Sequence, residues 1–323
     1  MAALAAALAA QPRTAMAMRV ASECVLEHPH AHTPDVGYDA QKVRVVFFDN
    51  RPNPDVSAMQ QAAKLVQRAS RTPVEFHALL QRDVAQRREQ WGLRVHPIAL
   101  PPLAHCLYSY LIASSHGPGV QYLYKVFVPW MLPWSIPRAL LLDTDVATIR
   151  DVSMLWSSFE RFGGALFGLA AEQNDLYKPL FGLNGGVQLL DLHGMRRSRE
   201  YLRAIASFNT HGYRIGYLGD QTFYTIMAHL HPHFFHRVGC EWNRQLSTHF
   251  GVDRLWRCRA GCSLVHANQG PVKYVVRFLQ RNAGVSCSAW HRFIREGRNG
   301  SEAHIHGALM AHFWWCCSDT RDS

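Results

Sequence analysis

The sequence contains short, almost continuously apolar runs that alternate with amphipathic segments. Residues 42–50 (KVRVVFFDN), 72–80 (TPVEFHALL) and 137–145 (PRALLLDTD) are clear examples, and another run lies within residues 89–100. Runs of this length and composition are typical of strands that are buried on both faces of a parallel sheet. Helical spacing of apolar residues over 55–70 completes a β-α-β rhythm. The sequence therefore predicts an α/β fold with a Rossmann-like, mixed but mostly parallel sheet and helices on both faces.

The second half of the chain predicts further strands and helices by the same criteria. Strands are expected at residues 165–172, 184–192 and 262–270. Helices are expected at residues 122–133, 151–159, 195–208 and 220–230. Asp151 stands at the start of one of these helices, where a carboxylate can accept from exposed N–H groups.

The ends of the chain differ from its middle. Residues 1–40 lack periodicity and are expected to form an N-terminal tail or a degenerate targeting segment. Residues 41–283 are expected to form one large domain, and residues 284–323 an irregular C-terminal tail. No run of about 18 consecutive apolar residues occurs, so neither a membrane anchor nor a clear signal anchor is visible.

The formal net charge of +10 would suit nucleic acid, an anionic membrane or an anionic small substrate. The basic residues are scattered, and no basic run is interleaved with aromatic residues as in a nucleic-acid-binding surface. We therefore predict no nucleic-acid partner and favour an anionic nucleotide as the substrate.

Three of the eight cysteines, Cys240, Cys258 and Cys262, fall close together. They suggest a zinc site, a disulfide or buried thiols. Because a fourth ligand at a zinc-like spacing is missing, the disulfide is favoured, although the sequence does not say which two cysteines form it.

Two carboxylates, Asp143 and Asp145, follow the apolar strand at residues 139–142. In open α/β sheets ligands bind beyond the carboxyl ends of the strands, and two acids one residue apart can reach one hard divalent cation. Such an ion would neutralise the phosphates of a nucleotide. The alternative is a helix cap and a solvated loop acid.

Two glycine-containing motifs follow. In residues 183–187 (LNGGV), Asn184, Gly185 and Gly186 are expected to form a strand-entry turn that lets the backbone approach a ligand, or else a β-bulge. Asp220 and Gln221 begin a helix, where they either cap it or face a sugar and stabilise positive charge at its anomeric carbon.

The last motif, HANQGPVK, contains His266, Gly270 and Lys273. A histidine beside two acids can complete an Asp/Asp/His metal site, and a lysine can neutralise a phosphate. With 19 histidines in the chain, His266 taken alone is weak evidence for a metal ligand, and an ordinary structural histidine is the favoured interpretation.

In their order, the motifs LLLDTD, NGGV, GDQ, CEWN and HANQG resemble those of the retaining glycosyltransferases of family 8. The sequence is most similar to the branch that contains glucoside xylosyltransferases and the xylosyltransferase domain of LARGE-type enzymes. The likeness covers roughly residues 41–283. It implies that this segment is a catalytic domain with the GT-A fold.

The resemblance also implies roles for individual residues. Metal ligands would be Asp143, Asp145 and His266, holding Mn²⁺ or Mg²⁺, and the catalytic pair beneath the anomeric carbon would be Asp220 and Gln221. Donor-binding residues would be Lys125, Asp143, Asn184, Gly185, Gly186, Gly270 and Lys273.

The activity that the resemblance implies is metal-dependent, retaining transfer of a sugar, xylose above all, from a UDP-sugar to a glycan or glycoprotein acceptor. It also implies a Golgi or ER lumen location, which suits the cysteines, although the sequence leaves a cytoplasmic location open. Three rival hypotheses stay open at this point: a catalytically inactive relative that binds UDP or glycan, a basic nucleic-acid-binding protein, and a metal-dependent phosphohydrolase.

Overall fold

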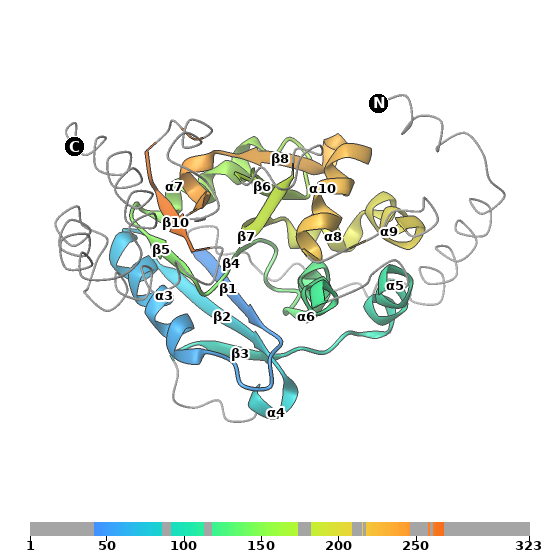
Figure 1. Cartoon of the computed structure of the whole chain (residues 1–323), viewed down its shortest axis with the longest axis horizontal. Coiled ribbons are helices and arrows are strands. Elements are labelled where there is room, and N and C mark those ends of the chain that lie inside the picture. The colour runs from blue at the N-terminus through green and yellow to red at the C-terminus, as the bar shows by residue number, and fades with distance from the viewer. Residues whose placement is uncertain are drawn as a thin grey trace, which may run out of the picture.

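A computed structural model gives the fold of the chain (Figure 1). The structure describes residues 42–85, 92–112, 118–173, 182–208, 215, 218–245, 258 and 261–267. The expected tail at residues 1–40, the C-terminal tail at residues 284–323 and the last part of the expected catalytic domain, residues 268–283, lie outside this part of the chain.

A seven-stranded sheet forms the centre of the fold, in the order β3-β2-β1-β4-β7-β6-β8. Strands β1, β2, β3 and β4 are mutually parallel, β7 runs antiparallel to both β4 and β6, and β6 is parallel to β8. The predicted mixed, mostly parallel sheet is therefore confirmed. The strands are β1 (Val43–Asp49), β2 (Val74–Leu80), β3 (Arg94–Pro97), β4 (Ala139–Leu142), β6 (Phe167–Ala171), β7 (Leu183–Leu190) and β8 (Phe235–Val238).

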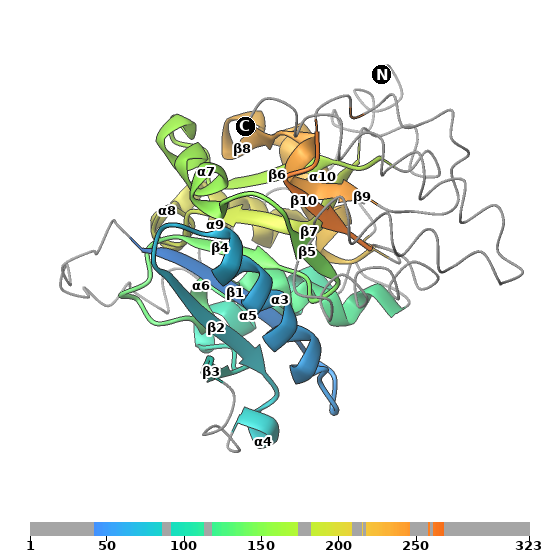
Figure 2. The same ribbon diagram turned by 90° about the vertical axis from the view of Figure 1, so that its left-hand side faces the viewer.

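Helices cover both faces of this sheet, as predicted (Figures 1 and 2). Because side chains alternate along a strand, the central strands contribute to both cores: Leu140 and Leu142 of β4 face one core and Leu141 the other. One face packs on α3 (Val56–Ala69) and α7 (Val152–Trp156). The other packs on α5 (Pro102–Ile112), α6 (Val128–Met131), α8 (Leu192–Arg197), α9 (Arg199–Ser207) and α10 (Asp220–Leu230).

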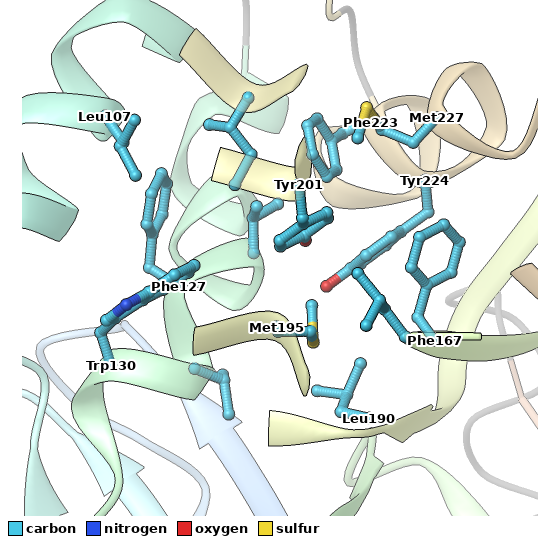
Figure 3. Close-up of a cluster of buried hydrophobic side chains, with 14 of the residues drawn as sticks. Leu107, Phe127, Trp130, Phe167, Leu190, Met195, Tyr201, Phe223, Tyr224 and Met227 are labelled. Carbon is cyan, nitrogen blue, oxygen red and sulfur yellow. The ribbon is translucent and has the colours of Figure 1, made fainter. Parts of the chain in front are cut away.

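The larger core is rich in aromatic rings (Figure 3). Tyr224 of α10 lies against Phe167 of β6 with ring centroids 4.8 Å apart, and Phe223 lies against Phe208 at 5.3 Å. These contacts fix α10 on the sheet, so the polar start of that helix has a defined place.

Several predicted elements differ in detail from those observed. Residues 122–133 form the end of a 3-10 helix, η2 (Pro118–Phe127), followed by α6, rather than one amphipathic helix. The helix expected at 195–208 is interrupted at Ser198, whose hydroxyl accepts from the N–H of Tyr201 and so begins α9 as a separate helix. At the start of α7, Asp151 caps the helix as predicted.

A second, three-stranded sheet lies beyond the carboxyl end of β4 (Figure 2). It consists of β5 (Val146–Thr148), β10 (Leu264–His266) and β9 (Arg244–Gln245), with β10 in the middle. The sequence predicts β10 but not the others, because strands of two or three residues carry no readable periodicity. Short helices complete the described fold: α4 (Arg82–Ala85), η3 (Ser157–Arg161), η6 (Pro232–Phe234) and η7 (Cys240–Asn243).

The cysteine pairing is resolved in part. Cys240 and Cys258 form a disulfide with each other, and Cys106 and Cys262 each take part in a disulfide as well. The preference for a disulfide over a zinc site is therefore confirmed. Among the described residues, no helix combines the length and apolarity needed to cross a membrane.

Arg196 of α8 holds together the segment that leads into β4. Its guanidinium is fully buried and donates to the carbonyl oxygens of Pro129, Leu132, Pro133, Trp134 and Ile136. Burial lowers the pKa of Arg196 to about 10, which still leaves it charged at neutral pH. One side chain thus satisfies carbonyls that the ending helix α6 and the following turn leave without intrahelical partners.

We predict that Arg196→Met lowers the free energy of unfolding by about 3 kcal/mol or more, because it leaves several buried carbonyls without donors. The neighbouring Arg197 is exposed, so Arg197→Met should change the free energy of unfolding by less than about 0.5 kcal/mol. Urea denaturation of the three proteins measures the difference. Equal destabilisation by the two variants would contradict this role of Arg196.

Candidate metal and nucleotide site

Asp143 lies immediately after β4 and is held by a buried lysine. Lys125 of η2 is 5% exposed, and its Nζ donates to Oδ1 of Asp143 at 2.6 Å. Burial works to lower the pKa of Lys125, but the nearby carboxylates of Asp143 and Asp220 outweigh it and raise that pKa. Lys125 is therefore a fixed positive charge beside the first acid of the DTD motif.

Asp143, Asp145 and His266 come together as a candidate metal-binding group. One ligand atom from each lies within 4.8 Å of the others. Nε2 of His266 is 3.4 Å from Oδ1 of Asp145 and 3.8 Å from Oδ2 of Asp143. The antiparallel pairing of β10 with β5 produces this arrangement, because it sets His266 opposite Val146, the residue after Asp145.

The donor set fits a divalent cation that prefers oxygen ligands and accepts an imidazole, as Mn²⁺ does. His266 is 3% exposed. Burial works to lower its pKa, but the hydrogen bond and charge of Asp145, with the charge of Asp143, raise it. The imidazole therefore stands in a strongly negative environment, which also favours a bound cation.

A chain of buried amide side chains orients the His266 ring. Oδ1 of Asn243 lies 3.0 Å from Nδ1 of His266, and Nδ2 of Asn243 donates to Oδ1 of Asn184 at 2.8 Å. Asn184 in turn donates from Nδ2 to Oε2 of Glu172 at 2.9 Å. The same carboxylate oxygen accepts from Nε2 of Gln221 at 2.8 Å.

The carboxylate of Glu172 and the backbone N–H of Gly186, which donates to Oδ1 of Asn184 at 3.0 Å, together set the direction of this chain. An ionised carboxylate only accepts, so Asn184 and Gln221 must turn their NH₂ groups toward it. The carbonyl of Asn184 then faces Asn243, and the carbonyl of Asn243 faces Nδ1 of His266. Nδ1 must therefore donate, which leaves Nε2 free to ligate a metal when the ring is neutral.

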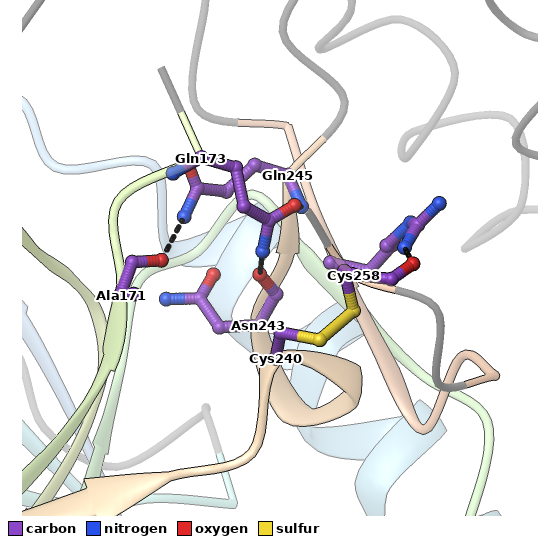
Figure 4. The surroundings of a disulfide bond; sticks show 7 residues. Ala171, Gln173, Cys240, Asn243, Gln245 and Cys258 are labelled. Atoms are coloured by element: carbon purple, nitrogen blue, oxygen red, sulfur yellow. Dashed lines mark hydrogen bonds between the residues drawn. A yellow bond between two sulfur atoms is a disulfide. The ribbon is translucent and has the colours of Figure 1, made fainter. Parts of the chain in front are cut away.

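η7 places Asn243 at this position (Figure 4). The disulfide of Cys240 to Cys258 anchors the start of η7, and Nε2 of Gln173 donates to the backbone carbonyl of Asn243 at 2.9 Å. Gln245 of β9 donates to the carbonyl of Ala171 at 3.3 Å. The segment CEWN is thus tied to the end of β6 on one side and to the disulfide on the other.

Asp220 and Gln221 begin α10 beside these groups. Oδ2 of Asp220 accepts from Nε2 of Gln188 at 2.8 Å and lies 4.0 Å from Nζ of Lys125. Burial raises the pKa of Asp220 to about 6, with Lys125 opposing the shift and Asp143 adding to it. Oε1 of Gln221 accepts from the N–H of Gly185 at 3.1 Å, so both ends of its amide are fixed.

Asn184, Gly185 and Gly186 lie inside β7, not in a turn that precedes it. Against β6 the register jumps, so that Ala170 is opposite Asn184 while Leu169 is opposite Gln188. The pairing of β7 with β6 is therefore interrupted by a register shift at this point, in line with the bulge alternative. The two glycines let neighbouring side chains approach the backbone of β7 closely. A Cβ on Gly186 would collide with the ring of His266, and one on Gly185 would lie 3.0 Å from Oδ2 of Asp220.

An open cleft adjoins the candidate metal group. It is lined by the carboxyl ends of β1 and β4 and by η2, namely by Phe48, Asp49, Asn50, Arg51, Gln121, Tyr122, Lys125, Asp143, Thr144 and Asp145. Asp49 accepts from the side chain and the backbone N–H of Arg51. The cleft thus presents the cations Lys125 and Arg51 and an exposed aromatic ring, that of Tyr122.

Gly270 and Lys273 lie outside the described residues, so their expected donor-binding role stays a prediction. Sequence analysis did not identify Glu172, Gln188 and Asn243 as site residues. Asn243 belongs to CEWN, one of the motifs that carry the family resemblance, and Glu172 lies within the predicted strand at 165–172; these were the only available signals.

No protein-family model matches the chain. It is 28% identical over 207 residues to xyloside xylosyltransferase 1 of mouse (Mus musculus), covering 52% of each protein. It is 30% identical over 181 residues to the mouse xylosyl- and glucuronyltransferase LARGE2, covering 49% of this chain and 25% of that protein. The chain therefore spans about half, or less, of the length of these relatives.

Solved structures agree with these relatives. The apo crystal structure of mouse xyloside xylosyltransferase 1 superposes with a TM-score of 0.55 at 23% identity, covering 70% of this chain and 98% of that one. The fold is that of the GT-A glycosyltransferases. Galactosyltransferase LgtC, solved with donor and acceptor sugar analogs, gives a TM-score of 0.52 at 17% identity over 83% of this chain and 96% of that chain. The resemblance to family 8 is thus confirmed.

We predict that Glu172→Gln weakens binding of Mn²⁺ about tenfold or more, because it removes the buried charge that accepts from Asn184 and Gln221 and can set its own NH₂ group against theirs, which disturbs the network that orients His266. Glu160→Gln, at an exposed glutamate of η3, is the matched control and should leave the affinity unchanged. Titration of Mn²⁺ followed by electron paramagnetic resonance measures both. Unchanged affinity in a folded Glu172→Gln protein would show that the amide chain does not orient the ligand.

Proposed function

We propose that the chain is a metal-dependent, retaining glycosyltransferase that moves a sugar from a UDP-sugar to a glycan or glycoprotein acceptor. One observation carries the proposal: the Asp143–Asp145–His266 group lies at the carboxyl end of a central strand, with Lys125 on one side and Asp220 within 4.0 Å of that lysine. The relatives with significant similarity are glycosyltransferases, and the fold is shared.

In this proposal Asp143, Asp145 and His266 hold Mn²⁺ or Mg²⁺. When bound, the ion neutralises charge on the diphosphate of the donor. Lys125 contributes a fixed positive charge next to the same phosphates, and the cleft beyond the end of β1 takes the nucleoside. The net charge of +10 favours the approach of an anionic donor.

Asp220 and Gln221 act at the sugar. Glu172 and the N–H of Gly185 fix the Gln221 amide, so the group presented to the anomeric carbon is pre-oriented and does not need to reorganise as positive charge develops there. Asn184, Gly185 and Gly186 line the donor side in the proposal, and the absence of a Cβ on the two glycines lets His266 and Asp220 approach the strand closely. Gly270 and Lys273 complete the donor site in the proposal.

Xylose is the sugar we propose, because the relatives named above are xylosyltransferases. UDP-glucose and UDP-glucuronate are the next donors to test. The catalytic domain is proposed to cover residues 41–283. We further propose that the reaction takes place in the lumen of the secretory pathway, in the Golgi or ER, where disulfides such as Cys240–Cys258 form and persist.

The proposal predicts that the protein releases UDP from one UDP-sugar in the presence of Mn²⁺ and that EDTA abolishes the release. Asp145→Asn should lower the rate by more than about tenfold, since it replaces an ionised metal ligand by a neutral amide. Asp83→Asn, at an exposed acid of α4, should leave the rate unchanged. A panel of UDP-sugars, with and without candidate acceptors, gives the measurement.

Other outcomes would decide between the rivals. Metal-dependent UDP binding without turnover of any donor would indicate a catalytically inactive relative. Release of phosphate from nucleotides that carry no sugar would indicate a phosphohydrolase. The absence of metal-dependent UDP binding would contradict the glycosyltransferase proposal itself.

A further inference from the structure

A second cluster of metal-ligating side chains lies apart from the one at the carboxyl end of β4. Glu200 in the first turn of α9 faces His231 and His233, which flank Pro232 after α10. One ligand atom from each lies within 4.8 Å of the others. Both imidazoles direct a nitrogen at the same oxygen: Nε2 of His233 is 3.1 Å, and Nδ1 of His231 is 3.8 Å, from Oε1 of Glu200.

We propose that Glu200, His231 and His233 form a binding site for a zinc-class transition-metal ion. Zinc ligands stand 2.0–2.1 Å from the ion at tetrahedral angles, so neighbouring ligand atoms are roughly 3.3 Å apart. The two nitrogen–oxygen separations lie on either side of that value. Two imidazoles and one carboxylate select zinc and its neighbours over Mg²⁺ or Ca²⁺, which take oxygen ligands.

The backbone that carries these ligands is pre-organised. The N–H of His231 donates to the carbonyl of Met227 at 2.8 Å, and the N–H of Phe234 donates to the carbonyl of His231 at 2.9 Å. Between them Pro232 restricts the backbone further. The His-Pro-His turn is therefore set before any ion arrives, which reduces the entropy lost on binding.

The ligand rings are also supported from beneath. Phe234 is buried, and its ring lies against those of both His231 and His233, with centroids 5.1 and 4.4 Å apart. It also packs edge-to-face on the buried ring of Tyr201, the residue after Glu200, at 5.7 Å. This aromatic contact joins α9 to η6 in the core and so holds Glu200 of α9 next to His231 and His233.

The cluster is open to solvent on its outer side. The side chain of His233 is 57% exposed, that of Glu200 60% and that of His231 29%. Three protein ligands leave a fourth position for water or another ligand, as in zinc sites that are not closed. A bound ion would link α9 to the end of α10, the helix whose first residues are Asp220 and Gln221, and so would brace that helix at its far end.

Zinc binding by the full-length protein tests the proposal. After equilibrium dialysis, His231→Ala/His233→Ala should carry one zinc ion per chain fewer than the wild type, measured by mass spectrometry of the metal. His229→Ala, at an exposed histidine of α10 outside the cluster, should match the wild type. Asp145→Asn should retain this ion, which separates the site from the one proposed for the glycosyl transfer.

A second variant covers the case in which the double variant fails to fold. Glu200→Gln changes one exposed carboxylate and should weaken zinc at this site at least about tenfold in competition with a chromophoric chelator. In the wild type, zinc should raise the melting temperature, and Glu200→Gln should reduce that rise. Equal zinc stoichiometry and affinity in the wild type and both cluster variants would overturn the proposal, as would a wild type that binds no zinc.

Discussion

The buried carboxylate of Glu172 anchors the hydrogen-bond network that orients the site, together with the backbone N–H groups of Gly185 and Gly186. Because the Glu172 carboxylate only accepts hydrogen bonds, the amides of Asn184 and Gln221 turn their NH₂ groups toward it. The carbonyl of Asn184 then accepts from Asn243, whose own carbonyl faces Nδ1 of His266. Buried polar networks of this kind hold one arrangement only when every member has a partner. The metal-ligating nitrogen and the amide proposed to face the sugar therefore depend on the same charge.

The fold supplies what this network needs from distant parts of the chain. Glu172 directly follows β6, β7 carries Asn184 at a shift in its pairing with β6, α10 begins at Asp220 and η7 carries Asn243. The disulfide of Cys240 with Cys258 holds η7, and Arg196 holds the segment before β4. Rigid elements thus place each polar group, as a site with a fixed electrostatic arrangement requires.

The sequence predicted the sheet, its helices and the meeting of Asp143 with Asp145 and His266, because strand ends and motif order are local signals. It did not decide between an entry turn and a β-bulge at Gly185 and Gly186 within the strand predicted at 184–192, and it did not predict that a chain of amides links His266 to Gln221. Those features depend on which strands become neighbours, such as β10 against β5. The short strands β5 and β9 and the break at Ser198 likewise follow from tertiary pairing and capping that periodicity does not report.

Diffraction from crystals grown with Mn²⁺ and UDP, measured at the manganese absorption edge, tests the central claim most directly. The account predicts one anomalous peak bounded by Asp143, Asp145 and Nε2 of His266, with the Nδ1 of that ring still bonded to Asn243. A peak at other residues, or a ring turned so that Nδ1 faces the ion, would contradict it.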